Sequence, residues 1–69
     1  MKQTLYYVIF DDSYVAEGRK FFKGKKYPVT KYDDDYVSLH AENGYFNLSN
    51  ELMDEMVIEW KLEKVEVDG

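Results

Sequence analysis

Apolar and polar residues alternate with a period of two along most of this chain. Together with the many β-branched and aromatic residues, this alternation predicts β-strands. We expect five strands, at residues 4–10, 27–32, 36–41, 45–48 and 56–62. In the last of these, the inner face is expected to consist of Met56, Ile58, Trp60 and Leu62.

Turn-forming residues separate the expected strands. Residues 11–13 and 33–35 carry short polar side chains that can hydrogen-bond their own backbone. Asn43-Gly44 predicts a tight hairpin turn with both residues at positive φ. Pro28 has no amide hydrogen, so we expect it at a sheet edge or at a bulge.

Two segments depart from the alternation. Residues 14–22 show no clean period and predict a long, irregular excursion. Residues 49–55 have helical character, because Ser49 or Asn50 can cap a helix whose first turn is acidic. Only one or two helical turns fit before the expected strand at 56–62.

The strand at residues 4–10 is apolar on both faces. One face carries Tyr6, Val8 and Phe10, and burying it against a second copy would supply apolar area that a short chain lacks. The sequence therefore leaves a homodimer through this strand open. The alternative is that the excursion at 14–22 folds over the same face.

Composition limits how such strands can form a core. The chain has 69 residues, enough for one domain over residues 1–69, and no cysteine to form a disulfide. A flat sheet of this size cannot cover its own apolar face, whereas a curled one can. We therefore predict a mainly β protein, a small five-stranded barrel with one short helical turn. Its core is expected to contain Val37, Leu39, Phe46, Ile58 and Trp60.

The stretch Phe22-Lys23-Gly24-Lys25-Lys26-Tyr27-Pro28-Val29 resembles a pattern of small SH3-like β-barrel proteins, many of them from Gram-positive bacteria and their phages. The order of elements that follows it is also similar, and the resemblance covers residues 15–60. It implies an SH3-like barrel in which residues 23–25 end the long first loop and residues 52–53 are the helical turn. The chain lacks the Ala-Leu-Tyr-Asp-Tyr run and the Trp-Trp pair of peptide-binding SH3 domains, so polyproline recognition does not carry over.

Charge is unevenly distributed. The net charge is −5, and seven of the fourteen acidic residues lie in the last nineteen positions. An acidic surface of this kind can occupy a basic groove on another protein, as a DNA mimic does. The residues we expect to bind a partner protein are Glu51, Asp54, Glu55, Glu59 and Glu63.

The opposite charge gathers in residues 19–27, which hold five of the nine basic residues and three aromatic ones. Such a segment can follow phosphates while a ring stacks on bases, as single-strand binders do. It can equally be a solvated loop whose rings belong to the core. The residues of this alternative nucleic-acid site are Arg19, Lys20, Lys23, Lys25 and Lys26.

Catalytic chemistry has little to build on here. His40 is the only histidine and is expected on the outer, solvent-facing side of a hairpin strand. The acidic run at 33–35 lacks the alternate ligand spacing of a calcium loop. We therefore expect no enzyme activity, no cofactor and no metal. No apolar run reaches the roughly 20 residues of a membrane span, and the lack of cysteine fits a cytoplasmic protein.

These observations predict a non-enzymatic binding module for a protein partner. One such module would be a small phage-encoded modulator of a host protein that acts through its acidic surface. The alternatives are a nucleic-acid-binding barrel that uses residues 19–27, and a structural or assembly subunit that uses strand 4–10.

Overall fold

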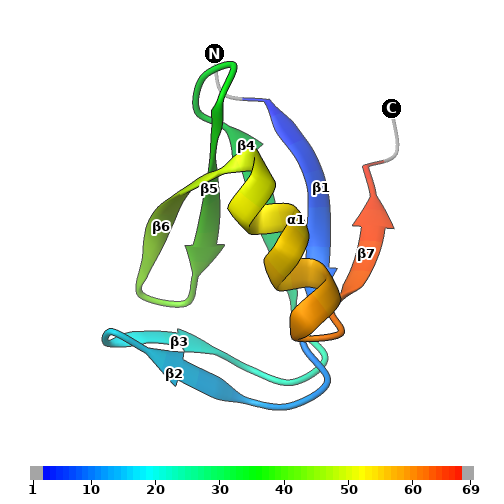
Figure 1. The fold of residues 1–69 in the computed structure, drawn as a ribbon. Coiled ribbons are helices and arrows are strands. Elements are labelled where there is room, and N and C mark those ends of the chain that lie inside the picture. The colour runs from blue at the N-terminus through cyan, green and yellow to red at the C-terminus, as the bar shows by residue number, and fades with distance from the viewer. Residues whose placement is uncertain (1–2, 68–69) are drawn as a thin grey trace.

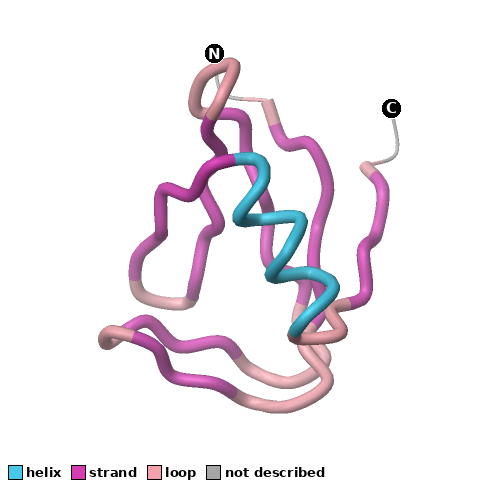
Figure 2. Tube along the Cα trace, in the orientation of Figure 1, coloured by secondary structure: helices cyan, strands magenta, loops and turns pink. Residues whose placement is uncertain are grey.

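The computed structural model describes residues 3–67 of the chain. This part is mainly β, with a single α-helix near its C-terminal end (Figures 1 and 2). The elements are β1 (Thr4–Ile9), β2 (Tyr14–Ala16), β3 (Arg19–Phe21), β4 (Lys26–Lys31), β5 (Tyr36–Ala41), β6 (Gly44–Ser49), α1 (Asn50–Glu59) and β7 (Glu63–Glu66).

Five of the strands form one antiparallel sheet in the order β6-β5-β4-β1-β7. Strands β4, β5 and β6 follow one another as neighbours. The chain then crosses one face of the sheet as α1 and returns as β7 beside β1 (Figure 1). Strands β2 and β3 form a separate hairpin.

The sheet is open, which corrects the expectation of a closed five-stranded SH3-like barrel. Strands β6 and β7 lie at its two edges and do not pair with each other. The apolar face is covered by α1 and by the β2–β3 hairpin instead of by curling of the sheet onto itself. The helix has ten residues, longer than the short helical turn that we expected.

The helix begins as predicted but continues through the segment expected to be the last strand. The Ser49 hydroxyl accepts a hydrogen bond from the Leu52 amide at 3.1 Å, as an N-cap does. The helix ends where Lys61 adopts a left-handed conformation (φ 53°) and the Leu62 amide donates to the Val57 carbonyl. Residues 56–59 are helical, so Ile58 lies on the outer face and is 78% exposed.

The excursion at 14–22 is more regular than expected. It forms the β2–β3 hairpin, whose two-residue turn consists of Glu17 (φ 48°) and Gly18 (φ 79°). This is the tight turn with two positive φ angles that we assigned to Asn43-Gly44. The β5–β6 turn instead consists of Glu42 and Asn43, one residue earlier, and is followed by Gly44 at φ 152°.

Two smaller expectations also need correction. Pro28 lies in β4, an interior strand and not an edge strand, and it pairs in register with Tyr7 of β1. The bulge-like register shift of this strand pair lies nearby, between Thr4 and Tyr6 of β1. The missing amide is tolerated there because β5 pairs with β4 only from Val29 to Lys31.

Ser38 lies two residues before His40 in β5 and so on the face that we expected to be exposed to solvent. It is buried instead, and its hydroxyl donates a hydrogen bond to the Asn47 side-chain oxygen at 2.7 Å.

The core lies between the sheet, α1 and the hairpin. Its centre is Phe10, whose ring stacks on Phe21 at 4.6 Å and meets the Tyr27 ring edge-on at 5.9 Å. The Trp60 ring, half-buried, meets Phe10 from the helix side at 6.0 Å. The buried hydrophobic residues of this core are Val8, Phe10, Phe21, Tyr27, Val29, Val37, Leu39, Met53 and Leu62.

The face of β1 that we considered for a homodimer is covered within the chain. Val8 and Phe10 have no exposed surface, and Tyr6 is half-buried. Because Phe10 contacts Tyr14 and Phe21, the excursion folds over this face, which was the alternative.

Candidate functional site

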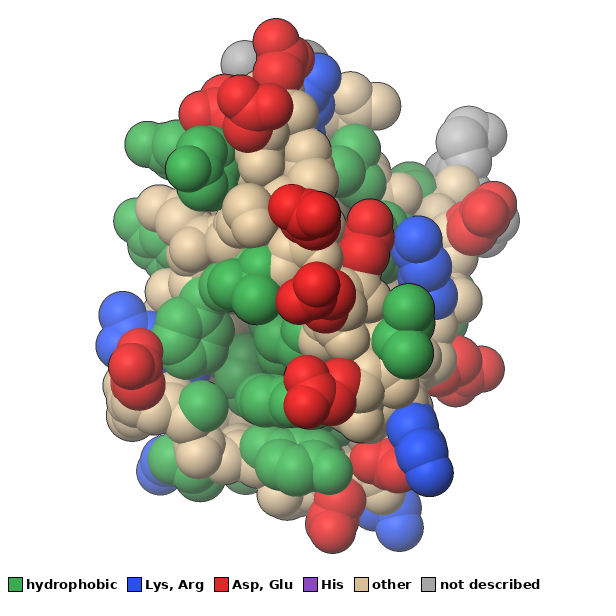
Figure 3. Space-filling model, viewed as in Figure 1, with side chains coloured by type: hydrophobic (Ala, Val, Ile, Leu, Met, Phe, Trp, Pro, Cys, Tyr) green, Lys and Arg blue, Asp and Glu red, His purple; other side chains and the backbone are tan. Residues whose placement is uncertain are grey.

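An apolar hollow lies on the helix side of the sheet, between α1, β6 and the β2–β3 hairpin (Figure 3). It consists of two adjoining cavities of about 220 and 330 Å³. Both cavities are lined by Leu48, Met56 and Trp60, so they form one continuous hollow, which we call the α1–β6 groove.

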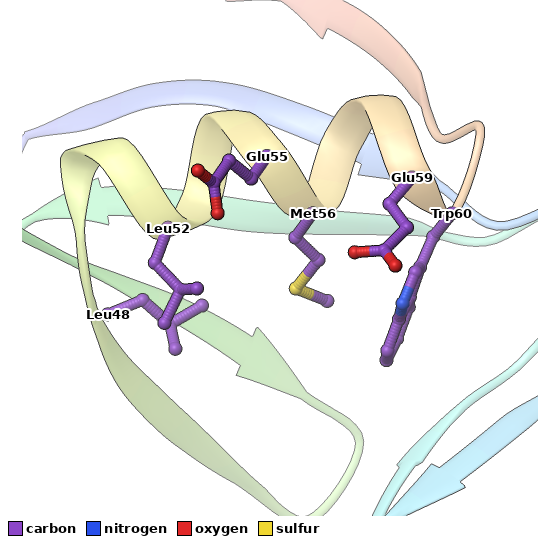
Figure 4. A pocket seen from close by; sticks show the side chains of 6 residues that line it. All are labelled: Leu48, Leu52, Glu55, Met56, Glu59 and Trp60. Carbon is purple, nitrogen blue, oxygen red and sulfur yellow. The ribbon is translucent and has the colours of Figure 1, made fainter.

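Regular secondary structure explains why apolar side chains converge there. Leu52 and Met56 of α1 and its C-cap Trp60 follow one another at intervals of four residues and so share a face. Along β6, Phe46 and Leu48 lie two residues apart and point to the same side of the sheet. Figure 4 shows the side chains of Leu48, Leu52, Met56 and Trp60 directed into a common space.

The β2–β3 hairpin closes one end of the groove with Ala16 and Glu17. Asn43 of the β5–β6 turn holds the hairpin in place. Its side-chain oxygen accepts from the Lys20 amide at 2.9 Å, and its side-chain nitrogen donates to the Gly18 carbonyl at 2.7 Å. The Glu42 amide adds a bond to the Lys20 carbonyl at 3.0 Å.

The rim of the groove is acidic. Glu55 and Glu59 line the helix side, Glu17 lines the hairpin end, and no Lys or Arg lines either cavity. Within residues 3–67 the ion pairs are Lys25–Glu42 and Lys31–Asp34, so none of the three rim carboxylates forms an ion pair. Figure 3 shows acidic side chains in a row along α1 beside the apolar hollow.

The five acidic residues predicted to bind a partner do not form one patch. Glu51, Glu55 and Glu59 recur every four residues along α1, and the last two reach the groove. Asp54 lies toward Tyr6 of β1: burial raises the pKa of Tyr6, and the charge of Asp54 raises it further. Glu63 lies at the start of β7, opposite Ile9 of β1. Asp68, the last acidic residue of the same region, lies outside the described residues.

The basic segment is also divided. The Arg19 guanidinium lies over the Phe46 ring at 5.4 Å, and its Nε is buried without a hydrogen-bond partner. Lys25 forms an ion pair with Glu42. Lys20, Lys23 and Lys26 remain exposed.

The two phenylalanines of this segment differ in burial. Phe21 belongs to the core, whereas Phe22 is 50% exposed. Three lysines and one ring are therefore available to a ligand, fewer than the five basic residues and three rings that the sequence offered.

Glu42 connects the basic segment to the β5–β6 turn. Its carboxylate accepts from the Lys25 ammonium and from the Tyr27 hydroxyl, the latter at 3.2 Å. The bond from Lys25 lowers the pKa of Glu42 and raises the pKa of Lys25. Burial raises the pKa of Tyr27, whose hydroxyl also accepts from the Phe22 amide at 2.6 Å. This cluster anchors the loop after β3.

His40 is half-buried on β5, which corrects the expectation of a solvent-exposed side chain. Its Nε2 lies 3.0 Å from the Thr30 hydroxyl and its ring lies beside Tyr45. Across residues 3–67 we find no group of three or more His, Asp or Glu side chains placed to hold a metal ion. In the same range no helix is long and apolar enough to cross a membrane.

The groove was missed by sequence reasoning because Met56 and Trp60, which line both of its cavities, were assigned to a core strand at 56–62. A signal was present: residues 52, 53, 56, 57 and 60 are apolar at helical spacing, and Glu55 and Glu59 follow the same period.

No protein-family model, curated protein or solved structure matches this chain.

Proposed function

We propose that this chain is a protein-interaction module that holds a segment of a partner protein in the α1–β6 groove. One observation carries the proposal: an apolar hollow with three unpaired carboxylates on its rim. Leu52, on the rim, is an apolar residue of the same row as Met56 and Trp60, yet it is 49% exposed. Concave apolar surface with a polar rim is typical of interaction sites.

The chemistry of the groove describes its partner. The floor would take apolar side chains, and the carboxylates of Glu17, Glu55 and Glu59 would pair with Lys or Arg around them. The net charge of −5 would also speed the encounter with a basic segment. If the groove held a basic segment of a host protein, the chain would act as a modulator of that protein. A phage origin of the chain stays a prediction.

Selection from a library of displayed random peptides tests this proposal. We expect the selected peptides to combine apolar residues with Lys or Arg, and to change the fluorescence of Trp60, the only tryptophan and a lining residue. The double charge reversal Glu55→Lys/Glu59→Lys should weaken their binding at least about tenfold, since each 1.4 kcal/mol is tenfold in affinity.

The matched control is Glu63→Lys/Glu66→Lys on β7. It changes the net charge by the same amount at exposed positions away from the groove. Binding that falls equally in both double variants would reflect overall charge alone and would contradict the proposal. So would selected peptides whose binding leaves Trp60 fluorescence unchanged.

A second candidate, binding of single-stranded nucleic acid, is favoured by the exposed Phe22 ring, which is followed in the chain by the exposed Lys23. Titration of labelled single-stranded DNA at low salt tests it, because phosphate contacts are strongest there. Binding that Phe22→Ala and Lys23→Glu both weaken, and that added salt abolishes, is the expected result. No binding at low salt would remove this candidate.

A further inference from the structure

We infer that the occupant of the α1–β6 groove is an amphipathic α-helix of a partner protein, with Lys or Arg beside its apolar stripe. This inference rests on the proposed function and adds to it the conformation and the charge pattern of the bound segment.

The position of the groove favours a helix. Its lining comes from the inner face of β6, through Phe46 and Leu48, and from one side of α1, through Leu52, Met56 and Trp60. The occupant would therefore lie above the sheet, in the layer of α1, and not in the plane of the sheet. Strand β6 is an edge strand, and α1 leaves the inner face of this edge partly uncovered (Figures 1 and 3).

Backbone hydrogen bonding supports the same choice. Buried amide and carbonyl groups need partners. Above the groove floor an extended segment would meet only apolar side chains and carboxylates, so most of its backbone groups would stay unpaired. A helix pairs its own backbone groups and can lie on an apolar floor without that penalty.

The dimensions also fit. From Leu52 to Trp60, the C-cap of α1, the groove spans eight residue intervals, about 12 Å at 1.5 Å per residue. Apolar residues at positions i, i+4 and i+7 of a partner helix span about 10 Å and would reach both cavities. Glu55 and Glu59 lie one helical interval apart, about 6 Å, which matches basic residues at i and i+4 of the partner.

Charge excludes a second copy of this chain as the source of the helix. Its own helix carries Glu51, Asp54, Glu55 and Glu59 and has no basic residue in its last turn. A second α1 in the groove would place carboxylates against carboxylates. The occupant must therefore come from a different, basic protein.

Two synthetic peptides of identical composition test the inference. Both are 18-residue leucine–lysine peptides, one with leucine at helical spacing and one with leucine and lysine in alternation, the pattern of a strand. Trp60 fluorescence measures binding and circular dichroism measures helix content. We expect the helical pattern to bind at least about tenfold more tightly, to gain helicity on binding, and to be weakened by Glu55→Lys/Glu59→Lys but not by Glu63→Lys/Glu66→Lys.

The outcomes separate the inference from the proposed function. Equal or tighter binding of the alternating peptide in the groove would overturn the helix and leave the interaction module standing. Failure of the helical peptide to change Trp60 fluorescence would also overturn the helix, and the displayed-peptide selection would then decide whether the groove binds any segment. A helix-patterned leucine–glutamate peptide that binds as well as its lysine counterpart would overturn the basic partner.

Discussion

At the scale of single residues, Gly44 fixes how the hairpin rests on β6. Its φ of 152° is one that L side chains rarely adopt, and a Cβ there would lie 3.1 Å from Nε of Arg19. We expect Gly44→Ala to lower the free energy of unfolding by about 1–3 kcal/mol, through backbone strain and displacement of Arg19. Urea unfolding measures the loss.

The control for Gly44 is Gly18→Ala. Gly18 also has a positive φ, 79°, but its Cβ would meet nothing within 4 Å, so this variant carries only the backbone cost. If both variants lose the same free energy, the contact with Arg19 has no weight. Adding Arg19→Ala to Gly44→Ala should recover part of the loss, as expected for coupled neighbours.

The pair of Glu42 and Lys25 predicts a pH dependence. Because Lys25 lowers the pKa of Glu42, the folded state favours the carboxylate. Its contribution is complete above the ordinary value of 4.5 and is lost as the pH falls through the lowered pKa. Glu42→Gln keeps an acceptor for the Tyr27 hydroxyl but removes the charge.

Thermal unfolding between pH 2 and pH 7 measures this effect. The wild-type chain should be more stable than Glu42→Gln at neutral pH, and the difference should disappear in acid. Lys25 gives the mirror image, because its raised pKa makes its contribution complete below 10.5 and lost above the raised value. A difference that stays constant with pH would contradict the charge-based account.

At the scale of elements, α1 predicts which apolar residues stabilise the fold. Met53 is 1% exposed and faces the core, whereas Ile58 lies on the outer side of the helix. We expect Met53→Ala to cost about 2–5 kcal/mol and Ile58→Ala less than about 0.5 kcal/mol, both measured by urea unfolding. The expected strand at 56–62 would bury Ile58 on its inner face, and Ile58→Ala would then cost much more than about 0.5 kcal/mol. This pair of variants therefore decides between the helical period and the strand period.

The strands were easier to predict from the sequence than the helix. Residues 36–41 alternate and form β5 over the same bounds, and residues 4–10 form β1 apart from Phe10. The segment 56–62 satisfies both periods, because Met56 and Trp60 are apolar in either reading. Contact with the core decides in favour of the helix, and a single-sequence pattern contains no information on that contact.

The candidate site shows the same division. Glu55 and Glu59 were found by charge alone, since seven acidic residues near one end of the chain are conspicuous in any fold. Ala16 and Glu17 could not be assigned to the site, because only the docking of the hairpin brings them to α1. Their place depends on bonds to Asn43 more than twenty residues away, which no local pattern predicts.

At the scale of the whole molecule, the docking of the hairpin on the sheet completes the groove. Asn43 makes two of the bonds that join these parts, to the Lys20 amide and the Gly18 carbonyl. We expect Asn43→Ala to increase amide exchange in β2 and β3 about tenfold, because a lost hydrogen bond of this kind is worth roughly 0.5–1.5 kcal/mol. Exchange in β4 and β5 should stay within about twofold, since the five-stranded sheet does not use these bonds.

Asn43→Asp separates the two bonds, because it keeps the oxygen that accepts from the Lys20 amide and removes the donor to Gly18. Its effect on exchange should lie between those of the wild type and Asn43→Ala. Both variants should also weaken any ligand of the α1–β6 groove, because a mobile hairpin no longer holds Ala16 and Glu17 at its end. Exchange that rises equally in the hairpin and in β5 would mean that the two parts unfold together, and the groove would then have no separately movable wall.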